Sequence, residues 1–504
     1  MFSPVARRVF AVLFGAMLVF ACPVSAWPAD KAAAAAETES ADSDLWQAVY
    51  LSGQRVGFNH LVTEEIERDG HKVIVSDVLS QLTIKRFGVS LTMSVSLATE
   101  EDADGNLLAF RTSIENPPIS SIRSQGKVAN GKVEVTTTSS GKDITTVQEW
   151  DPEAKSQAWI SRVLEKELVK DGDSRSFKFY DPQFSKVATM TVSRIGRVET
   201  ELLGDVKKSL DKYEATHSLV PGVVTMMYVD EEGTTLKEEV KLLDMVTYAV
   251  SREEAEKELS GADLDFGMDT VIKTGKIPGA HQSRKGVYKV TVQGRAKGTL
   301  PEGATQSVKP LSDTELELTV TSIKPGEPGD EPAAGESFLA SSRFLDTGDP
   351  RVRELAKEGA GTETDPAKLA VALEKFVHTR LKNKNFSTAL ATASEVAKEL
   401  SGDCTEHAVL LAALLRVNHI PSRVVIGFVY ADKLEGFGGH MWTEAYVDGR
   451  WAPLDATLGL GGIGVGHIKV ADADLAENTT APLTAFVPII HLLKKTTVKV
   501  VKIE

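Results

Sequence analysis

Residues 401–408 read Ser-Gly-Asp-Cys-Thr-Glu-His-Ala, and this stretch decides how the chain is interpreted. Gly402 and Asp403 are turn and cap residues, so Cys404 falls in the first turn of a helix that we expect to run to about Val417. The free N–H groups and the dipole of a helix N-terminus favour an anion, and a thiolate is such an anion. The sequence therefore predicts that the local backbone helps to activate Cys404.

A base and an orienting group follow further along the chain. His440 stands in residues 438–446, Gly-Gly-His-Met-Trp-Thr-Glu-Ala-Tyr, at the expected start of a strand. Asp455 ends the next expected strand, and Asp448-Gly449 between the two is a hairpin signal. A hairpin would bring the imidazole and the carboxylate side by side, which fixes the imidazole tautomer. We therefore predict a catalytic triad of Cys404, His440 and Asp455.

Residues from about 393 to 459 resemble the transglutaminase-like core shared by transglutaminases, certain bacterial cysteine proteases and peptide N-glycanases. The resemblance implies a cysteine-dependent acyl-transfer reaction with the same three triad residues. Five blocks carry it, in the family's order: Gly402-Asp403-Cys404, Leu414-Leu415-Arg416, Ile420-Pro421-Ser422-Arg423, His440-Met441-Trp442 and Leu454-Asp455-Ala456-Thr457.

Three features depart from the family pattern. Ala456 follows the aspartate where the family usually has proline, and Asn418-His419 replaces a small residue and glycine. Family members often use an aromatic side chain before the cysteine as an oxyanion donor, and no tryptophan lies between Trp159 and Cys404. The backbone N–H of Cys404 is one expected donor, and the second donor is left unassigned.

Other residues in these blocks could have either a functional or a structural role. His407 lies three residues after Cys404 on the expected helix, so it either lines the site or packs elsewhere. Trp442 contacts substrate or belongs to the core, and Glu406 is expected in solvent. Zinc bound by Cys404, His407 and His440 is an alternative to the triad. The order of the strands favours the triad, so we expect neither a metal nor a cofactor.

The expected fold class is α+β, with a C-terminal papain-like or transglutaminase-like core preceded by a large antiparallel β-rich region. Alternating apolar residues and turn signals, Asn130-Gly131 above all, indicate strands over residues 44–275. A small β unit is expected at 286–323, a proline-rich linker at 324–336 and the catalytic domain at 337–495.

The N-terminus predicts export. Arg7 and Arg8 precede an apolar run and a small-residue cleavage pattern at residues 24–26, which is typical of a signal peptide over residues 1–26. Residues 27–43 are interpreted as a flexible tether. A membrane anchor, or a lipid on Cys22 that tethers the protein to a membrane, are the alternatives. The expected location is periplasmic or extracellular.

The number of cysteines and the net charge limit the classes of function that the chain could have. Cys22 and Cys404 are the two cysteines, so cleavage would leave one thiol, which is either reactive or a plain core residue. A formal net charge of -14 argues against nucleic acid as a partner. We expect a protein or peptide substrate whose carbonyl reacts through a thioester, in a protease, amidase or transglutaminase. The alternative is a non-catalytic binding module that uses the β-rich forepart, with a vestigial C-terminal domain.

Overall fold

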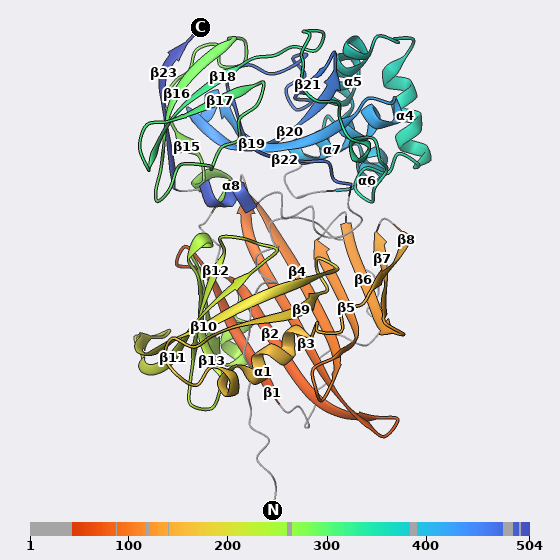
Figure 1. The fold of residues 1–504 in the computed structure, drawn as a ribbon. Coiled ribbons are helices and arrows are strands. Elements are labelled where there is room, and N and C mark those ends of the chain that lie inside the picture. The colour runs from red at the N-terminus through yellow and green to blue at the C-terminus, as the bar shows by residue number, and fades with distance from the viewer. Residues whose placement is uncertain are drawn as a thin grey trace, which may run out of the picture. The chain divides into compact units, whose positions relative to one another are not determined.

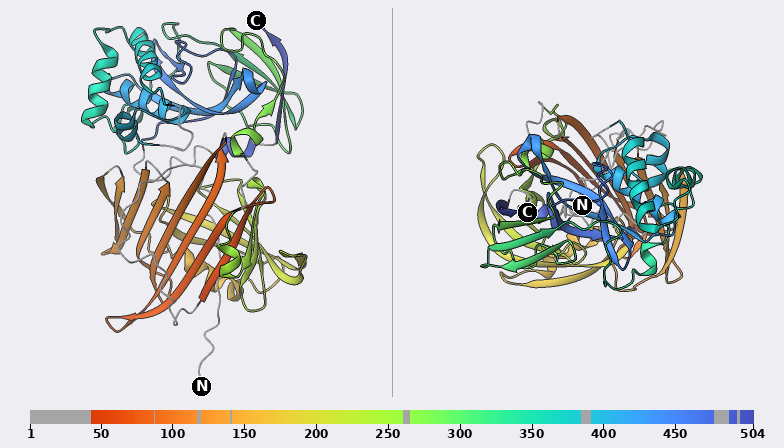
Figure 2. Two further views of the ribbon diagram at one scale, coloured as in Figure 1. Left: turned by 180° about the vertical axis from the view of Figure 1, so that it is seen from behind. Right: turned by 90° about the horizontal axis from the view of Figure 1, so that it is seen from above.

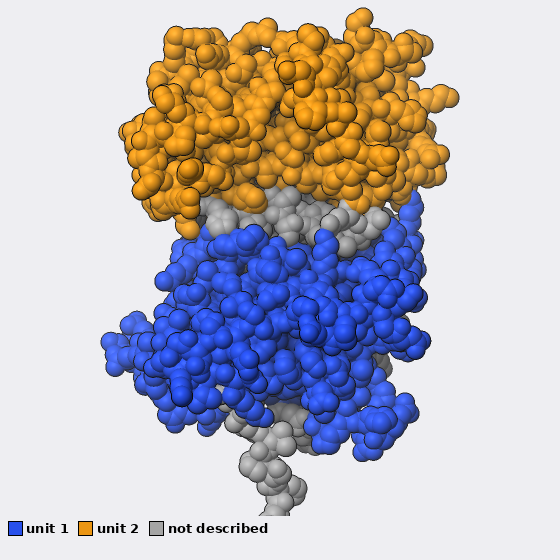
Figure 3. Space-filling model, viewed as in Figure 1, with its two compact units in different colours: residues 1–84, 90–264 blue, residues 85–89, 265–504 orange. Residues whose placement is uncertain are grey.

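The computed structural model describes residues 43–86, 88–116, 120–139, 141–259, 265–383, 391–476, 487–492 and 495–504. The expected signal peptide, the tether up to residue 42 and Cys22 lie outside these ranges. The chain forms two compact units: unit 1 comprises residues 1–84 and 90–264, and unit 2 comprises residues 85–89 and 265–504 (Figure 3). Within the described ranges, no helix has both the length and the apolar character that crossing a membrane requires.

Unit 1 is built around one fourteen-stranded sheet that curves strongly (Figures 1 and 2). Its strands lie in the order β8-β7-β6-β5-β4-β3-β2-β1-β14-β13-β12-β11-β10-β9, so β1 and β14 join two meanders. The elements are β1 (Ser43–Leu51), β2 (Gln54–Arg68), β3 (His71–Arg86), β4 (Val89–Asp102), β5 (Leu107–Asn116), β6 (Ser120–Ala129), β7 (Lys132–Ser139), β8 (Lys142–Glu149), α1 (Gln157–Glu167), β9 (Ser174–Asp181), β10 (Lys186–Glu201), β11 (Lys207–His217), β12 (Val224–Val229), β13 (Thr235–Val240), η2 (Lys241–Leu243), β14 (Met245–Val250) and α2 (Arg252–Ala255).

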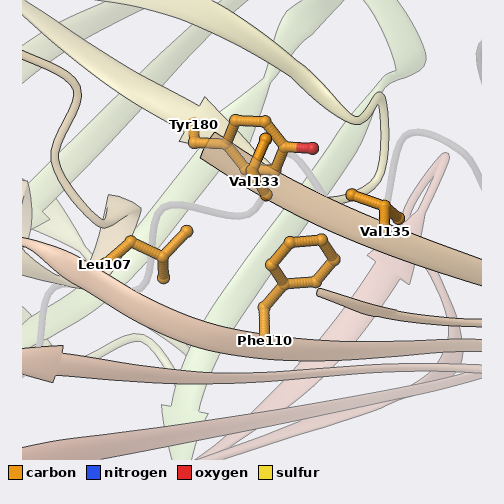
Figure 4. Packing of buried hydrophobic residues seen from close by; sticks show 5 residues of the cluster. All are labelled: Leu107, Phe110, Val133, Val135 and Tyr180. Atoms are coloured by element: carbon orange, nitrogen blue, oxygen red, sulfur yellow. The ribbon is translucent and has the colours of Figure 1, made fainter. Parts of the chain in front are cut away.

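Local sequence explains one turn of this sheet, and a long-range core cluster joins strands that lie far apart in the strand order. Asn130 and Gly131 have φ angles of 53° and 70° between the paired residues Ala129 and Lys132, which confirms the predicted two-residue hairpin. Tyr180 on β9 packs with buried apolar residues of β5 and β7 (Figure 4): Leu107, Phe110, Val133 and Val135. The two ends of the sheet therefore share one core cluster.

Unit 2 combines helices with two antiparallel sheets. One sheet has the order β15-β20-β19-β22, with β21 added to β20, and the other has the order β17-β18-β16-β23. The elements are α3 (Phe266–Asp269), β15 (Ile272–Lys273), β16 (Lys285–Val292), β17 (Gln306–Pro310), β18 (Glu315–Thr321), η3 (Glu336–Phe338), α4 (Pro350–Ala360), α5 (Pro366–Arg380), α6 (Ala393–Glu399), α7 (Cys404–Val417), β19 (Ser422–Ala431), η4 (Asp432–Leu434), β20 (Gly436–Val447), β21 (Arg450–Leu454), β22 (His467–Ala473), α8 (Val487–Leu492) and β23 (Thr496–Ile503).

The segments before the expected catalytic domain are integral to unit 2. Ile272 pairs with Phe437 of β20, so residues 265–275 do not belong to the β-rich unit. Tyr288 on β16 donates a hydrogen bond from its hydroxyl to the Val465 carbonyl at 2.7 Å, so residues 286–323 do not form a unit of their own. The expected linker is also fixed, because the Gly329 N–H donates to the Asp448 carbonyl at 2.8 Å.

Helix α7 is the central helix of unit 2. It packs against β19, β20, α4, α5 and α6, and every residue from Thr405 to Arg416 is buried. A helix that is buried on all sides carries apolar residues all round, as residues 408–415 do. This burial fixes the position of its N-terminus, where Cys404 lies.

Candidate active site

Cys404 is the first residue of α7, as predicted. The Asp403 side chain accepts a hydrogen bond from the Thr405 N–H at 2.9 Å, and the Glu406 side chain accepts one from the Asp403 N–H at 2.9 Å. This reciprocal capping box defines where the helix begins. Cys404 is a free cysteine and is partly exposed.

Glu406 is not in solvent as expected but is fully buried. Besides the Asp403 N–H, it accepts hydrogen bonds from the Ala391 N–H at 3.1 Å and the Thr405 hydroxyl at 2.9 Å. Burial, together with the charge of Asp403, raises the pKa of Glu406 to about 8. Gly402 has a φ of +144°, and a Cβ there would lie 2.4 Å from the Glu406 Cβ, so this turn requires glycine.

The predicted hairpin brings His440 and Asp455 together. Asp448 and Gly449 have φ angles of 51° and 77° between β20 and β21, and Asp455 directly follows β21. His440 Nε2 lies 2.8 Å from Asp455 Oδ2. The ring is 9% exposed and the carboxylate is fully buried, so water cannot easily replace this bond.

The electrostatics of the pair favour an imidazolium beside a carboxylate. Burial acts to lower the pKa of His440, but the charges of Asp455 and Cys404 and hydrogen bonds to both side chains raise it to about 10. Burial acts to raise the pKa of Asp455, but His440 and His467 hold it well below its ordinary value. His440 thus hydrogen-bonds to Asp455 and interacts electrostatically with Cys404.

Sequence analysis did not identify His467, which bonds to the same carboxylate oxygen. His467 Nε2, at the start of β22, lies 3.0 Å from Asp455 Oδ2. Between β20 and β22 stands β19, where Gly427 pairs with His440. A Cβ at Gly427 would lie 2.8 Å from the Trp442 ring and 2.1 Å from the Ile468 carbonyl oxygen, so glycine permits this close packing.

Glu374 on α5 is a second buried group that sequence analysis did not identify. Its carboxylate accepts hydrogen bonds from the backbone N–H groups of Asp455 at 3.0 Å, Gly461 at 2.7 Å and Gly462 at 3.3 Å. Burial is the main reason that the pKa of Glu374 is raised to about 7. Glu374 therefore anchors the backbone that carries Asp455.

The two supporting residues predicted from sequence are both buried. His407 Nδ1 lies 2.6 Å from the Asp403 carbonyl oxygen, so its ring braces the start of α7 from within. Trp442 is 2% exposed, and its ring stacks on His440 with the centroids 6.3 Å apart. Both positions fit packing around the triad better than contact with substrate.

The ligand atoms of His440, Asp455 and His467 lie within 4.8 Å of one another, a spacing that a metal ion could use. Both Nε2 atoms are at hydrogen-bond distance from the carboxylate itself. An ionised carboxylate only accepts hydrogen bonds, so the short distances are explained by two N–H donors.

Comparison with known families agrees with the geometry of this site. Residues 353–456, which contain Cys404, His440 and Asp455, match the family model of the transglutaminase-like superfamily. The chain therefore contains a transglutaminase-like domain in unit 2.

Solved structures similar to the chain are distant. A proposed cysteine protease from Cytophaga hutchinsonii is 16% identical, with a TM-score of 0.28, over 43% of this chain and 86% of its own. A β-barrel-like protein of a domain of unknown function from Brucella abortus is 14% identical, with a TM-score of 0.29, over 41% of this chain and 94% of its own. A proposed protease from Parabacteroides distasonis is 12% identical, with a TM-score of 0.19, over 69% and 68%. No curated protein matches the chain.

Proposed function

We propose that the protein is an exported, cysteine-dependent acyl-transfer enzyme that acts on peptide or glutamine carboxamide carbonyls. The observation that carries this proposal is the position of His440, whose Nε2 hydrogen-bonds to Asp455 and whose ring interacts with Cys404 closely enough for the cysteine to raise the pKa of the histidine. Cys404 is partly exposed at a helix N-terminus, so the nucleophile is both stabilised and accessible.

The proposed reaction proceeds through a thioester. The Cys404 thiolate attacks the carbonyl carbon, and the carbonyl oxygen becomes an oxyanion. The His440 imidazolium then gives its proton to the leaving amine as the carbon–nitrogen bond breaks. A water molecule or an amine next gives its proton to His440 and attacks the thioester, which releases the acyl product and restores the thiolate. Asp455 keeps the imidazole in one tautomer and stabilises its positive charge throughout.

The Cys404 backbone N–H is the donor that we propose for the oxyanion. It lies at the first position of α7, where an N–H has no intrahelical acceptor. Trp442 does not supply the second donor in this conformation, because its indole N–H is buried.

We favour hydrolysis over transfer to an amine. We also propose that the segment over residues 1–26 directs export, and that the protein stays at a membrane only where Cys22 carries a lipid. These statements rest on the sequence pattern of the N-terminus and on the size of unit 1.

The test is to trap the acyl-enzyme by mass spectrometry. The full chain is prepared with Cys22→Ser, so that Cys404 is the remaining thiol, and is incubated with a thiol-directed acyl probe or a peptide mixture, with and without a primary amine. We expect one acyl adduct on Cys404, and no adduct after Cys404→Ala. Undiminished labelling of the Cys404→Ala protein would show that another nucleophile reacts. Release of free acid alone indicates hydrolysis, whereas an amide product indicates transamidation.

A further inference from the structure

We infer that His467 is a positioning residue of this site: its Nε2–H and that of His440 together hold the Asp455 carboxylate and tune how strongly His440 retains its proton. This role rests on the proposed function, because it concerns the same triad. It is independent of which carbonyl compound is the substrate.

The hydrogen bonds of Asp455 show that the second histidine completes its coordination. Oδ1 accepts a hydrogen bond from the Thr457 N–H at 2.8 Å, and Oδ2 accepts from both rings, at 2.8 Å and 3.0 Å. Asp455 and the His467 side chain are fully buried. Because water cannot reach this oxygen, loss of the His467 donor would leave part of a buried carboxylate unsatisfied.

The tautomer of His467 follows from its partner. The ionised carboxylate accepts hydrogen bonds only, so His467 donates from Nε2, and its Nδ1 carries a lone pair. That Nδ1 is buried without a hydrogen-bond partner among the described residues. Burial lowers the pKa of His467, and the nearby His440 and His281 also disfavour a second positive charge. His467 is therefore a neutral donor to a carboxylate that also pairs with a cation.

This arrangement has a chemical consequence for His440. A second N–H on Oδ2 takes up part of the negative charge that would otherwise bind the His440 proton. Without it, Asp455 would hold that proton more tightly, and the imidazolium would be a weaker acid toward the leaving amine. Loss of the His467 N–H donor should therefore have two effects: His440 should lose its proton at a higher pH, and the acylation step should be slower.

The groups around this centre come from several elements. Cys404 faces His440 from α7, Glu374 on α5 binds the Asp455 backbone, and His281 contacts the His467 ring with the centroids 5.8 Å apart. Trp442 meets the His467 ring edge-on at 5.2 Å. A purely packing role for His467 would be kept by phenylalanine, whereas the donor role would be lost.

The experiment compares His467→Phe, His467→Leu and His467→Gln with the unsubstituted site, all in the full-length Cys22→Ser chain. Nitrogen-15 NMR of labelled histidines follows the deprotonation of His440, which is assigned with His440→Gln. Phenylalanine and leucine remove the donor, and glutamine returns an N–H at a similar reach. The matched control is His281→Phe, since His281 contacts the same ring but not the carboxylate.

We expect the midpoint pH for deprotonation of His440 to rise by about half a pH unit or more in the two variants without a donor, His467→Phe and His467→Leu. In His467→Gln it should return toward the original value. Acylation of Cys404 by the probe should slow by about tenfold or more, which is the effect of losing a hydrogen bond to a charged group. The control should keep the original midpoint. Thermal unfolding checks that each variant folds. If only one of His467→Phe and His467→Leu folds, that variant alone completes the test.

The outcomes separate this inference from the proposed function. An unchanged His440 midpoint in a folded donor-free variant overturns the role of His467, even if the enzyme acylates normally. A shifted midpoint in a protein that never forms an acyl-enzyme supports the role of His467 and contradicts the proposed function.

Discussion

Each unit contains a buried histidine–aspartate pair, His217 with Asp181 in unit 1 and His440 with Asp455 in unit 2, and these two pairs differ in the surroundings of the histidine ring. In unit 1, His217 Nε2 lies 3.1 Å from Asp181 Oδ2, close to the 2.8 Å of His440 and Asp455 in unit 2. The Nδ1 atom of His217 accepts a hydrogen bond from the Leu219 N–H at 3.1 Å, so the ring closes a local turn. His440 instead interacts with a partly exposed cysteine.

The comparison teaches that a buried histidine–aspartate pair is not in itself an active site. The His217 ring packs against Phe179 and Phe184, and Asp181 also accepts from the Gln183 N–H at 2.9 Å. Every one of these contacts holds the fold of unit 1. The reactivity that we propose for unit 2 depends in addition on a nucleophile, Cys404, beside the His440 ring.

The largest expected difference between the two pairs is in catalysis. Asp455→Asn should slow acylation of Cys404 by about 10⁴-fold, because the amide no longer fixes the tautomer of His440. Asp181→Asn should leave acylation unchanged and lower the melting temperature of unit 1. Probe labelling and thermal unfolding of both variants check this pair of outcomes. An equal loss of labelling in the two variants would contradict the division of roles.

A second comparison concerns the two capping-box glutamates of unit 2. Glu406→Ala removes the acceptor of three buried donors and should lower the free energy of unfolding by about 2–4 kcal/mol, while also slowing acylation, since it loosens the helix start at Cys404. Glu395 makes the same kind of capping box with Thr392 on α6, so Glu395→Ala should destabilise the unit with little effect on acylation.

Urea unfolding and probe labelling separate these effects. If Glu395→Ala slowed labelling as much as Glu406→Ala does, the inference that Glu406 has a particular effect on Cys404 would be wrong.

The pH dependence of stability should distinguish unit 2 as well. The pKa of His440 is raised from 6.5 to about 10, so its stabilising contribution is fully present below pH 6.5 and is lost as pH rises toward 10. The raised pKa of Glu406, about 8, has the same sign. Between pH 7 and 9 the two groups together should lower the free energy of unfolding by about 4 kcal/mol.

Urea titrations at several pH values measure this decline, and Asp455→Asn should make it smaller, because the carboxylate that raises the pKa of His440 is gone. A stability that stays level or rises from pH 7 to 9 would refute the charge assignment.

The smallest expected effect is that of the other histidine near the cysteine. His407→Asn can still donate to the Asp403 carbonyl, so acylation should change by less than about threefold. The labelling rate of His407→Asn is measured and compared with that of Asp455→Asn under the same conditions. A loss as large as that of Asp455→Asn would mean that His407 takes part directly, as the zinc alternative supposes.

The parts that sequence predicted are those with a local signal. The cap before Cys404, the Asp448-Gly449 hairpin and the aspartate at the strand end bring three residues together through short-range rules. Glu406 also has such a signal, since Asp403 and Glu406 have capping-box spacing, but a glutamate is ordinarily exposed. Its burial depends on the loop at Ala391, which spacing cannot predict.

His467 and Glu374 could not be predicted because their partners are remote. His467 lies on β22, on the other side of β19 from the strand that carries His440, and Glu374 on α5 binds the backbone at Asp455 from a position 81 residues earlier in the sequence. The same limit applies to domain boundaries. Ile272 and residues 286–323 look like strands in the sequence, but only their pairing shows that they belong to unit 2.

The pairing of β16 sets the order in which unit 2 can mature. One edge of β16 pairs with β18, which follows soon after it, but the other pairs with β23, where Gly286 faces Ile503. Until the ribosome has released β23, β16 has an open edge that another chain could occupy. The sheet of unit 2 that contains β16 is therefore completed only after β23 has been made, more than 200 residues later in the sequence.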